Sequence, residues 1–133
     1  NNDLYKINVD IYSPCAIGAT INDETIEQLK CKIIAGAANN VLENYDKHGD
    51  VLLNKGILYA PDYVINAGGL INIYNELNDY NRDKVYNQVE TIYDTLMDIF
   101  YRSEDKGIAT NAISDILAKK RIKEKRKAKE PSY

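Results

Sequence analysis

Three segments of this chain combine small side chains with amides, which suits them to binding a flat polar group. They are residues 13–18 (Ser-Pro-Cys-Ala-Ile-Gly), 35–40 (Ala-Gly-Ala-Ala-Asn-Asn) and 60–69 (Ala-Pro-Asp-Tyr-Val-Ile-Asn-Ala-Gly-Gly). Small side chains let a flat ring come close to the backbone, and an Asn amide offers both a donor and an acceptor that match a carboxamide. Taken singly, each segment is also explained by tight packing. A binding role therefore requires that the fold bring the segments together.

Each segment follows a run of residues that predicts a β-strand. The runs cover residues 7–12, 32–35 and 57–60, where β-branched and aromatic residues precede turn formers. Asn22-Asp23-Glu24-Thr25 is typical of a capped helix start between the first two runs, and 46–54 predicts a second short helix, ended by Gly56. This order predicts an α/β fold, with three parallel strands and crossover helices. Ligands of such sheets bind beyond the carboxyl ends of the strands, where all three segments would lie.

Helices follow the third strand. From Asp62 the chain predicts a helix that is apolar almost all round and should therefore be buried on most sides. Its apolar positions are Val64, Ile65, Ala67, Leu70, Ile71, Ile73 and Leu77. The pair Gly68-Gly69 interrupts it, and each internal glycine costs a helix about 1 kcal/mol against alanine. Two together indicate a packing requirement or the close approach of another group to the backbone.

Two further helices are expected toward the C-terminus. An amphipathic helix is predicted over 82–106, with Gly107 as its stop, and a last helix after Thr110 should bury Ile113, Ile116 and Leu117. We therefore divide the chain near residue 80. Residues 1–80 would form a partial α/β domain, and residues 81–133 a C-terminal helical segment with a basic tail.

Composition and charge exclude several classes of protein. The 44% hydrophobic and 28% charged content is that of a globular domain, and no apolar run approaches the roughly 18 residues of a membrane span. Residues 119–130 hold eight Lys or Arg against two Glu, although the net charge is −3. This run suits either a solvated helix end or a footprint for nucleic acid or a membrane surface. A pI near 5.2 and the absence of aromatic residues within the run argue against nucleic acid.

The cysteines and the histidine do not form a recognisable site. Cys15, Cys31 and the single His48 lack metal-ligand spacing, so we expect no metal and free thiols in a reducing cytosol. Cys15 as a nucleophile would need a base beside it, and none is evident. His48 could be proposed as a general base, but its polar surroundings favour a surface or capping role. The chain begins Asn1-Asn2 without Met, so we expect that its beginning is missing.

Together the three segments closely resemble one family. Leucine dehydrogenase and its relatives in the glutamate, leucine, phenylalanine and valine dehydrogenase superfamily carry Ala-Pro-Cys-Ala-Leu-Gly, then Asn-Asp-Glu-Thr-Ile, then Ala-Gly-Ser-Ala-Asn-Asn, then His-Gly-Asp. Tyr-Ala-Pro-Asp-Tyr-Val-Ile-Asn-Ala-Gly-Gly completes the series and is its most specific motif. The match here runs from about Val9 to Ala112, with Ser13, Ile17 and Ala37 as small departures. The resemblance places the chain in the second half of a dinucleotide-binding Rossmann domain.

The resemblance implies an NAD-dependent enzyme that deaminates a branched-chain L-amino acid to its 2-oxo acid. By family position Cys15, Ala16, Ala38 and Asn39 would line the nicotinamide end of the cofactor. Asn66, Gly68, Gly69, Leu70 and Ile73 would bind the substrate, and Asn66 would hydrogen-bond either its carboxylate or the cofactor amide. Leu70 and Ile73 are bulkier than the valines usual in the family, so the pocket should favour valine-sized side chains. For the full-length form we expect a cytoplasmic homo-oligomer that has no membrane or nucleic-acid partner.

The same resemblance implies that the chain alone is inactive. In the family a Gly-x-Gly-x-x-Gly phosphate loop, an acidic ribose ligand, and the catalytic lysines and aspartate all precede the part that matches here. We therefore expect a fragment without the acid and base of the reaction, and no catalytic residue is assigned in this chain. Two alternatives stay open. The chain could be a non-catalytic remnant that binds a protein partner, or a relative of valine or phenylalanine dehydrogenase.

Overall fold

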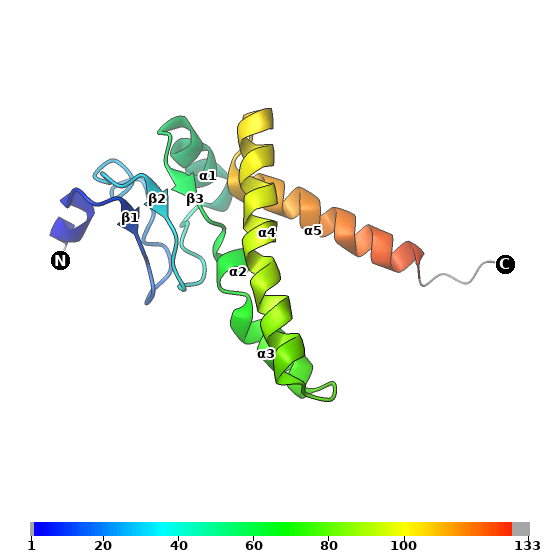
Figure 1. Ribbon diagram of the computed structural model, residues 1–133. Coiled ribbons are helices and arrows are strands. Elements are labelled where there is room, and N and C mark those ends of the chain that lie inside the picture. Colours follow the sequence, from blue (N-terminus) through cyan, green and yellow to red (C-terminus); the bar gives the residue numbers. More distant parts are fainter. Residues whose placement is uncertain (1, 129–133) are drawn as a thin grey trace.

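The computed structural model describes residues 2–128, and its centre is a small parallel sheet. After a short 3-10 helix, η1 (Asn2–Lys6), come strands β1 (Ile11–Tyr12), β2 (Ile33–Ile34) and β3 (Leu58–Tyr59). They lie side by side in the order β1-β2-β3, with Ile11 opposite Ile33 and Ile33 opposite Leu58 (Figure 1). The predicted three-stranded parallel sheet is confirmed. The strands are shorter than predicted because regular pairing covers two residues of each.

The first crossover, residues 13–32, contains turns where a helix was predicted, so that expectation is wrong. The cap itself is present, since Oδ1 of Asn22 accepts the backbone N–H groups of Glu24 and Thr25 at 3.1 and 3.0 Å. Ile26 N–H then reaches the Asn22 carbonyl, but the next backbone bond is of the shorter i to i+3 type, from Gln28 to Thr25. The Thr25 hydroxyl also donates to the Thr20 carbonyl at 2.7 Å. Such local side-chain bonds compete with helix propagation.

The second crossover carries α1 (Tyr45–Asn54), as predicted. Asn44 caps it by accepting the Lys47 N–H at 3.0 Å, and the helix ends before Gly56, whose φ of +68° favours glycine. α1 packs against β3, and its Leu52 lies in the hydrophobic core. The buried side chains of this core include Ile21, Ile26, Ile34, Val41, Leu42, Leu52, Ile57 and Tyr59.

The helix predicted from Asp62 is two helices, α2 (Asp62–Ile65) and α3 (Gly68–Glu76), separated at residues 66–67. The expectation that it is buried on most sides is wrong. Leu70, Ile73 and Leu77 are 73%, 56% and 80% exposed, because α3 packs against α4 on one side only (Figure 1). The contact side is marked by Asn75, which is fully buried and donates to Gln88 at 2.6 Å.

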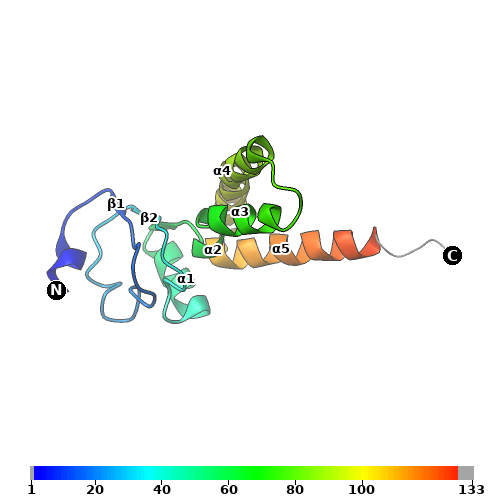
Figure 2. The same ribbon diagram turned by 90° about the horizontal axis from the view of Figure 1, so that it is seen from below.

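Helix α4 (Arg82–Lys106) has the predicted bounds, with Asn81 as N-cap and left-handed Gly107 after its last residue. α5 (Thr110–Lys127) crosses the body beside α1 and α4, and its last turns project away from it (Figure 2). Ile113 is buried as expected, but Ile116 is 51% exposed because Ser114 and Asn111 face the core instead. Residues 119–127 of the basic run lie on exposed turns, and Lys129 and Glu130 lie outside the described residues. Within residues 2–128 the helices are too short or too polar to cross a bilayer.

Candidate functional site

The first two strand-end loops, residues 13–18 and 35–40, pack directly on each other. A Cβ on Gly36 would lie 2.7 Å from the Pro14 nitrogen, and one on Gly18 would lie 2.8 Å from the carbonyl oxygens of Asn39 and Asn40. The Ala38 N–H donates to the Pro14 carbonyl at 2.9 Å. Glycine at these two positions is therefore explained by the close approach of one loop to the other.

The third segment joins the second through an amide pair, Asn39 and Asn66. Nδ2 of Asn66 donates to Oδ1 of Asn39 at 2.6 Å and to the carbonyl of Ala37 at 3.3 Å. An open cleft of about 650 Å³ lies beside this pair. The cleft is lined by Ala37, Asn39, Tyr63, Ile65, Asn66, Ala67, Gly68, Gly69, Leu70, Val89 and Ile92. Five predicted site residues, Asn39, Asn66, Gly68, Gly69 and Leu70, therefore line one space.

The amide pair leaves one donor and one acceptor for a ligand. Its internal bond uses Asn66 Nδ2 and Asn39 Oδ1, and among the described residues neither Asn66 Oδ1 nor Asn39 Nδ2 has a hydrogen-bond partner. A carboxamide presents the complementary acceptor and donor. The chemistry of this pair fits the amide end of a nicotinamide ring, and it fits a carboxylate through Asn39 Nδ2 alone.

The double glycine at the start of α3 is not explained by packing. A Cβ on Gly69 would meet nothing within 4 Å, and one on Gly68 would only touch Val89 at 3.9 Å. Neither glycine has a positive φ, so other residues could adopt the same backbone. Both glycines line the cleft. Their bare backbone therefore leaves room for a ligand beside the amide pair.

Four predicted site residues lie elsewhere. Cys15 and Ala16 are exposed on the first loop, outside the lining of the cleft. Ser13 hydrogen-bonds to the Cys15 sulfur at 3.4 Å, which lowers the pKa of this thiol from its ordinary value. Ala38 is 5% exposed within the hydrophobic core, and Ile73 is exposed one turn beyond the cleft. The structure thus brings the predicted amides and glycines together, and these four residues lie outside the lining of the cleft.

A hydrogen-bonded cluster of two tyrosines and an aspartate lies beside the cleft and was not predicted from the sequence. The Tyr63 hydroxyl donates to Oδ1 of Asp115 at 2.9 Å, and the Tyr45 hydroxyl lies 3.2 Å from both Tyr63 Oη and that carboxylate oxygen. Burial, followed by its neighbours, raises the pKa of Tyr45 far above its ordinary value, and burial also raises the pKa of Tyr63. Tyr63 and Asp115 are 52 residues apart, so no local pattern could have paired them.

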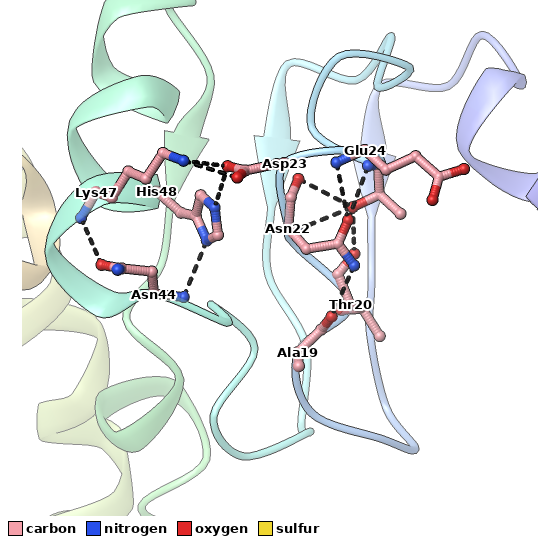
Figure 3. A network of polar contacts seen from close by, with 9 residues as sticks. Ala19, Thr20, Asn22, Asp23, Glu24, Asn44, Lys47 and His48 are labelled. Carbon is pink, nitrogen blue, oxygen red and sulfur yellow. Dashed lines mark hydrogen bonds and ion pairs between the residues drawn. The ribbon is translucent and has the colours of Figure 1, made fainter.

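The sequence favoured a surface or a capping role for His48, and the structure shows a buried capping residue that does not line the cleft. It sits within α1, is 1% exposed, and bridges two segments (Figure 3). Its Nδ1 accepts the Asn44 N–H at 3.0 Å, so Nε2 carries the proton of the neutral ring and donates to Asp23 at 3.0 Å. Lys47 also binds Asp23, at 2.7 Å. Both ring nitrogens are hydrogen-bonded, so neither is available as a general base. The ring instead caps the start of α1 and links this helix to Asp23.

Comparison with known proteins places the chain in a family of amino-acid dehydrogenases. The family described as Glutamate/Leucine/Phenylalanine/Valine dehydrogenase matches residues 1–129. Leucine dehydrogenase of Bacillus cereus is 55% identical over 121 residues, which are 91% of this chain and 33% of that protein. L-tryptophan dehydrogenase of Nostoc punctiforme is 51% identical over 127 residues, 96% of this chain and 36% of that protein. The chain therefore spans about a third of the length of these curated relatives.

Solved structures agree with this placement. The crystal structure of L-tryptophan dehydrogenase from Nostoc punctiforme has a TM-score of 0.90 and 50% identity, and the match covers 95% of this chain and 38% of that one. A hetero-hexameric glutamate dehydrogenase from Thermus thermophilus matches with a TM-score of 0.71 and 21% identity, over 99% of this chain and 33% of its own, and shares the fold. With the family matched over nearly its whole length, the chain belongs to the glutamate, leucine, phenylalanine and valine dehydrogenase family.

Proposed function

We propose that this chain forms the nicotinamide end of the cofactor site and part of the substrate pocket of an NAD-dependent, branched-chain L-amino-acid dehydrogenase. The observation that carries the proposal is the Asn39–Asn66 pair, bonded at 2.6 Å, beside the bare backbone of Gly69 in one cleft. The free acceptor on Asn66 and the free donor on Asn39 would hold a carboxamide in a fixed orientation. NAD, when bound, would supply the hydride acceptor, and these residues would orient its ring.

The substrate side chain would lie against α3. Leu70 lines the cleft and Ile73 follows it one turn later, and both expose more than half of their surface. A ligand that covers these side chains would gain about 25 cal/mol for each Å² of apolar surface removed from water. Their bulk favours a valine-sized side chain over a leucine-sized one. One methylene is worth only about 1 to 3 kcal/mol, so leucine would still be accepted.

The chain alone would bind and orient without catalysing. Of the described residues that line the cleft, only Tyr63 carries a titratable group. Burial raises the pKa of Tyr63, and its hydroxyl donates a hydrogen bond to Asp115. Tyr63 is therefore not a base at neutral pH. We expect no amino-acid-dependent reduction of NAD by the 133-residue chain, measured by the absorbance of the reduced cofactor. Turnover above background would contradict the proposal. The complete enzyme would be a cytosolic homo-oligomer in which other residues supply the acid and base.

The test uses leucine dehydrogenase of Bacillus cereus with its matching third replaced by this chain. Asn66→Ala should lower kcat/KM about ten- to a hundred-fold, because a bound carboxamide or carboxylate loses a partner worth about 1 to 3 kcal/mol. Asn72→Ala is the matched control, since this α3 amide bonds to Glu76 outside the lining of the cleft. Equal kcat/KM values for the two variants would reject the site. A higher kcat/KM for L-valine than for L-leucine would support the side-chain assignment.

A further inference from the structure

Asp62 is a buried carboxylate that none of the roles above employs. It opens α2 and is 9% exposed, and no ion pair among the described residues involves it. Its Oδ2 accepts the Val41 N–H at 2.9 Å, and its Oδ1 accepts the Tyr63 N–H at 2.6 Å. Hydrogen bonds to an ionised carboxylate are about twice as strong as neutral ones. A buried carboxylate that accepts backbone N–H groups, with the Tyr59 hydroxyl beside it, indicates a demand for fixed geometry.

The two donors belong to the two segments that carry the amide pair. Val41 follows Asn39 by two residues, and Asp62 precedes Asn66 by four. Backbone pairing between these segments ends at the bond from Ala60 N–H to the Ile34 carbonyl. Beyond it, within the described part of the chain, the bonds between residues 35–41 and 60–69 are those of Asp62 and Asn66 alone. The carboxylate therefore sets the spacing of the two backbones on one side of the amide pair.

Val41, which Asp62 binds, is also linked to the chain just after the first strand-end loop. The Val41 carbonyl accepts the Ile21 N–H at 3.0 Å, and the Asn40 carbonyl accepts the Ala19 N–H at 2.7 Å. Asn40 has a φ of +52°, which lets its carbonyl turn toward Ala19. Asp62 thus binds the end of the second loop, residues 35–40, next to the residues that hydrogen-bond to the end of the first loop. We infer that Asp62 is a positioning residue, which holds the second and third strand-end segments in register so that Asn39 and Asn66 meet at the cleft.

Asp62→Asn tests this geometry in the 133-residue chain. An amide has one acceptor oxygen, so its NH2 group would face either the Val41 or the Tyr63 N–H and one bond would be lost. By NMR, hydrogen exchange at the Val41 amide should rise about tenfold, and the Asn66 side-chain amide signals should move toward those of a free amide. Ser103→Ala is the control, because it removes a 2.6 Å bond to the Ile108 carbonyl, and neither residue lines the cleft. It should leave the Asn66 signals in place.

Unshifted Asn66 signals in Asp62→Asn would overturn the inference, as would an equal shift in Ser103→Ala. If Asp62→Asn fails to fold, Asp62→Ser can be used with the same NMR measurement, because the shorter serine side chain cannot reach the Val41 N–H. The consequence for catalysis rests on the proposed function and is measured in the chimeric enzyme. There Asp62→Asn should lower kcat/KM about tenfold, but less than about twofold when Asn66 is already Ala, because coupled residues are not additive.

The kinetic cycle separates two failures. Independent, multiplying effects of the Asp62 and Asn66 substitutions would overturn the positioning role, while the single effect of Asn66→Ala would still support the site. A silent Asn66→Ala variant would instead reject the proposed function. In that case the NMR comparison would still decide whether Asp62 places Asn66.

Discussion

Gly49 in α1 lies so close to Asn111 in α5 that a side chain at this glycine would collide with the asparagine. A Cβ on Gly49 would lie 2.7 Å from both Cγ and Nδ2 of Asn111, and closer still to Oδ1. Asn111 has no room to retreat, since it is 1% exposed and its Nδ2 donates to the Tyr45 carbonyl at 2.9 Å. The two helices therefore meet at a point where the small size of glycine is required.

Gly49→Ala should destabilise the fold even though alanine is the better helix former. Its gain of about 1 kcal/mol in helix propensity is outweighed by the clash and by the loss of the Asn111 bond. We expect a net loss of about 1 to 3 kcal/mol in the free energy of unfolding. Urea unfolding of the 133-residue chain measures it. A stability equal to or above that of the unsubstituted chain would show that α5 can move away.

Gly69→Ala should have the opposite effect on stability. A methyl group there meets open space, so the variant should keep its stability or gain up to about 1 kcal/mol. Activity of the chimeric enzyme should fall, because the methyl group enters the space that a ligand needs. The two measurements are melting temperature and kcat/KM. Lost stability with unchanged kcat/KM would mean that the glycines serve packing, and the assignment of Leu70 and Ile73 would lose its main support.

The bridge from Asp23 to α1 predicts a pH dependence. Lys47 first, and His48 second, lower the pKa of Asp23 from its ordinary value of 3.8. A carboxyl whose pKa is lower in the folded chain stabilises it fully above its unfolded pKa, and this contribution is lost as pH falls through the folded pKa. Asp23→Asn should therefore lower the melting temperature at pH 7 and matter progressively less below about pH 4.

The control for this bridge is Glu90→Gln, which neutralises an exposed carboxyl on α4. Its melting temperature should follow that of the unsubstituted chain at every pH. A constant difference between Asp23→Asn and the unsubstituted chain from pH 7 to pH 3 would show that charge plays no part in the bridge.

NAD should bind the 133-residue chain weakly or undetectably by calorimetry. Hydrogen bonds from Asn39 and Asn66 contribute about 1 kcal/mol each, below the roughly 4 kcal/mol that a millimolar Kd requires. In the family that the chain resembles, much of the remaining affinity comes from a phosphate loop ahead of the matching part. Tight binding that survives Asn66→Ala would place the cofactor away from this cleft.

Elements defined by local signals were predicted well from the sequence. α4 begins after the Asn81 cap and ends before Gly107, as its residues indicate, because capping and glycine conformations act within one turn. Both ends of α1 follow for the same reason. The first crossover failed although its cap is real, since the Thr25 hydroxyl turns to the Thr20 carbonyl and no long apolar face extends the helix.

Features that depend on distant partners were not predictable. Leu70 and Leu77 look like core residues in sequence, but exposure depends on which element covers α3, and α4 covers the opposite side. A capping role for His48 was among the two that its sequence context favoured, but its burial was not predictable, because it depends on a bond to Asp23, 25 residues earlier. The amide pair lies between these cases. The motifs named Asn39 and Asn66, but the 2.6 Å bond between them required the sheet that aligns their loops.

The order of the sheet has a consequence for how the chain folds as it is synthesised. β1, β2 and β3 are neighbours in the same order in which they are made, with paired residues 22 and 25 positions apart. β2 and β3 each therefore pair with a strand that has already been made. Loop closure over such lengths costs little more than over half the distance. The amide cleft is lined also by Val89 and Ile92 of α4, so it would be complete only after that helix has been made and has packed.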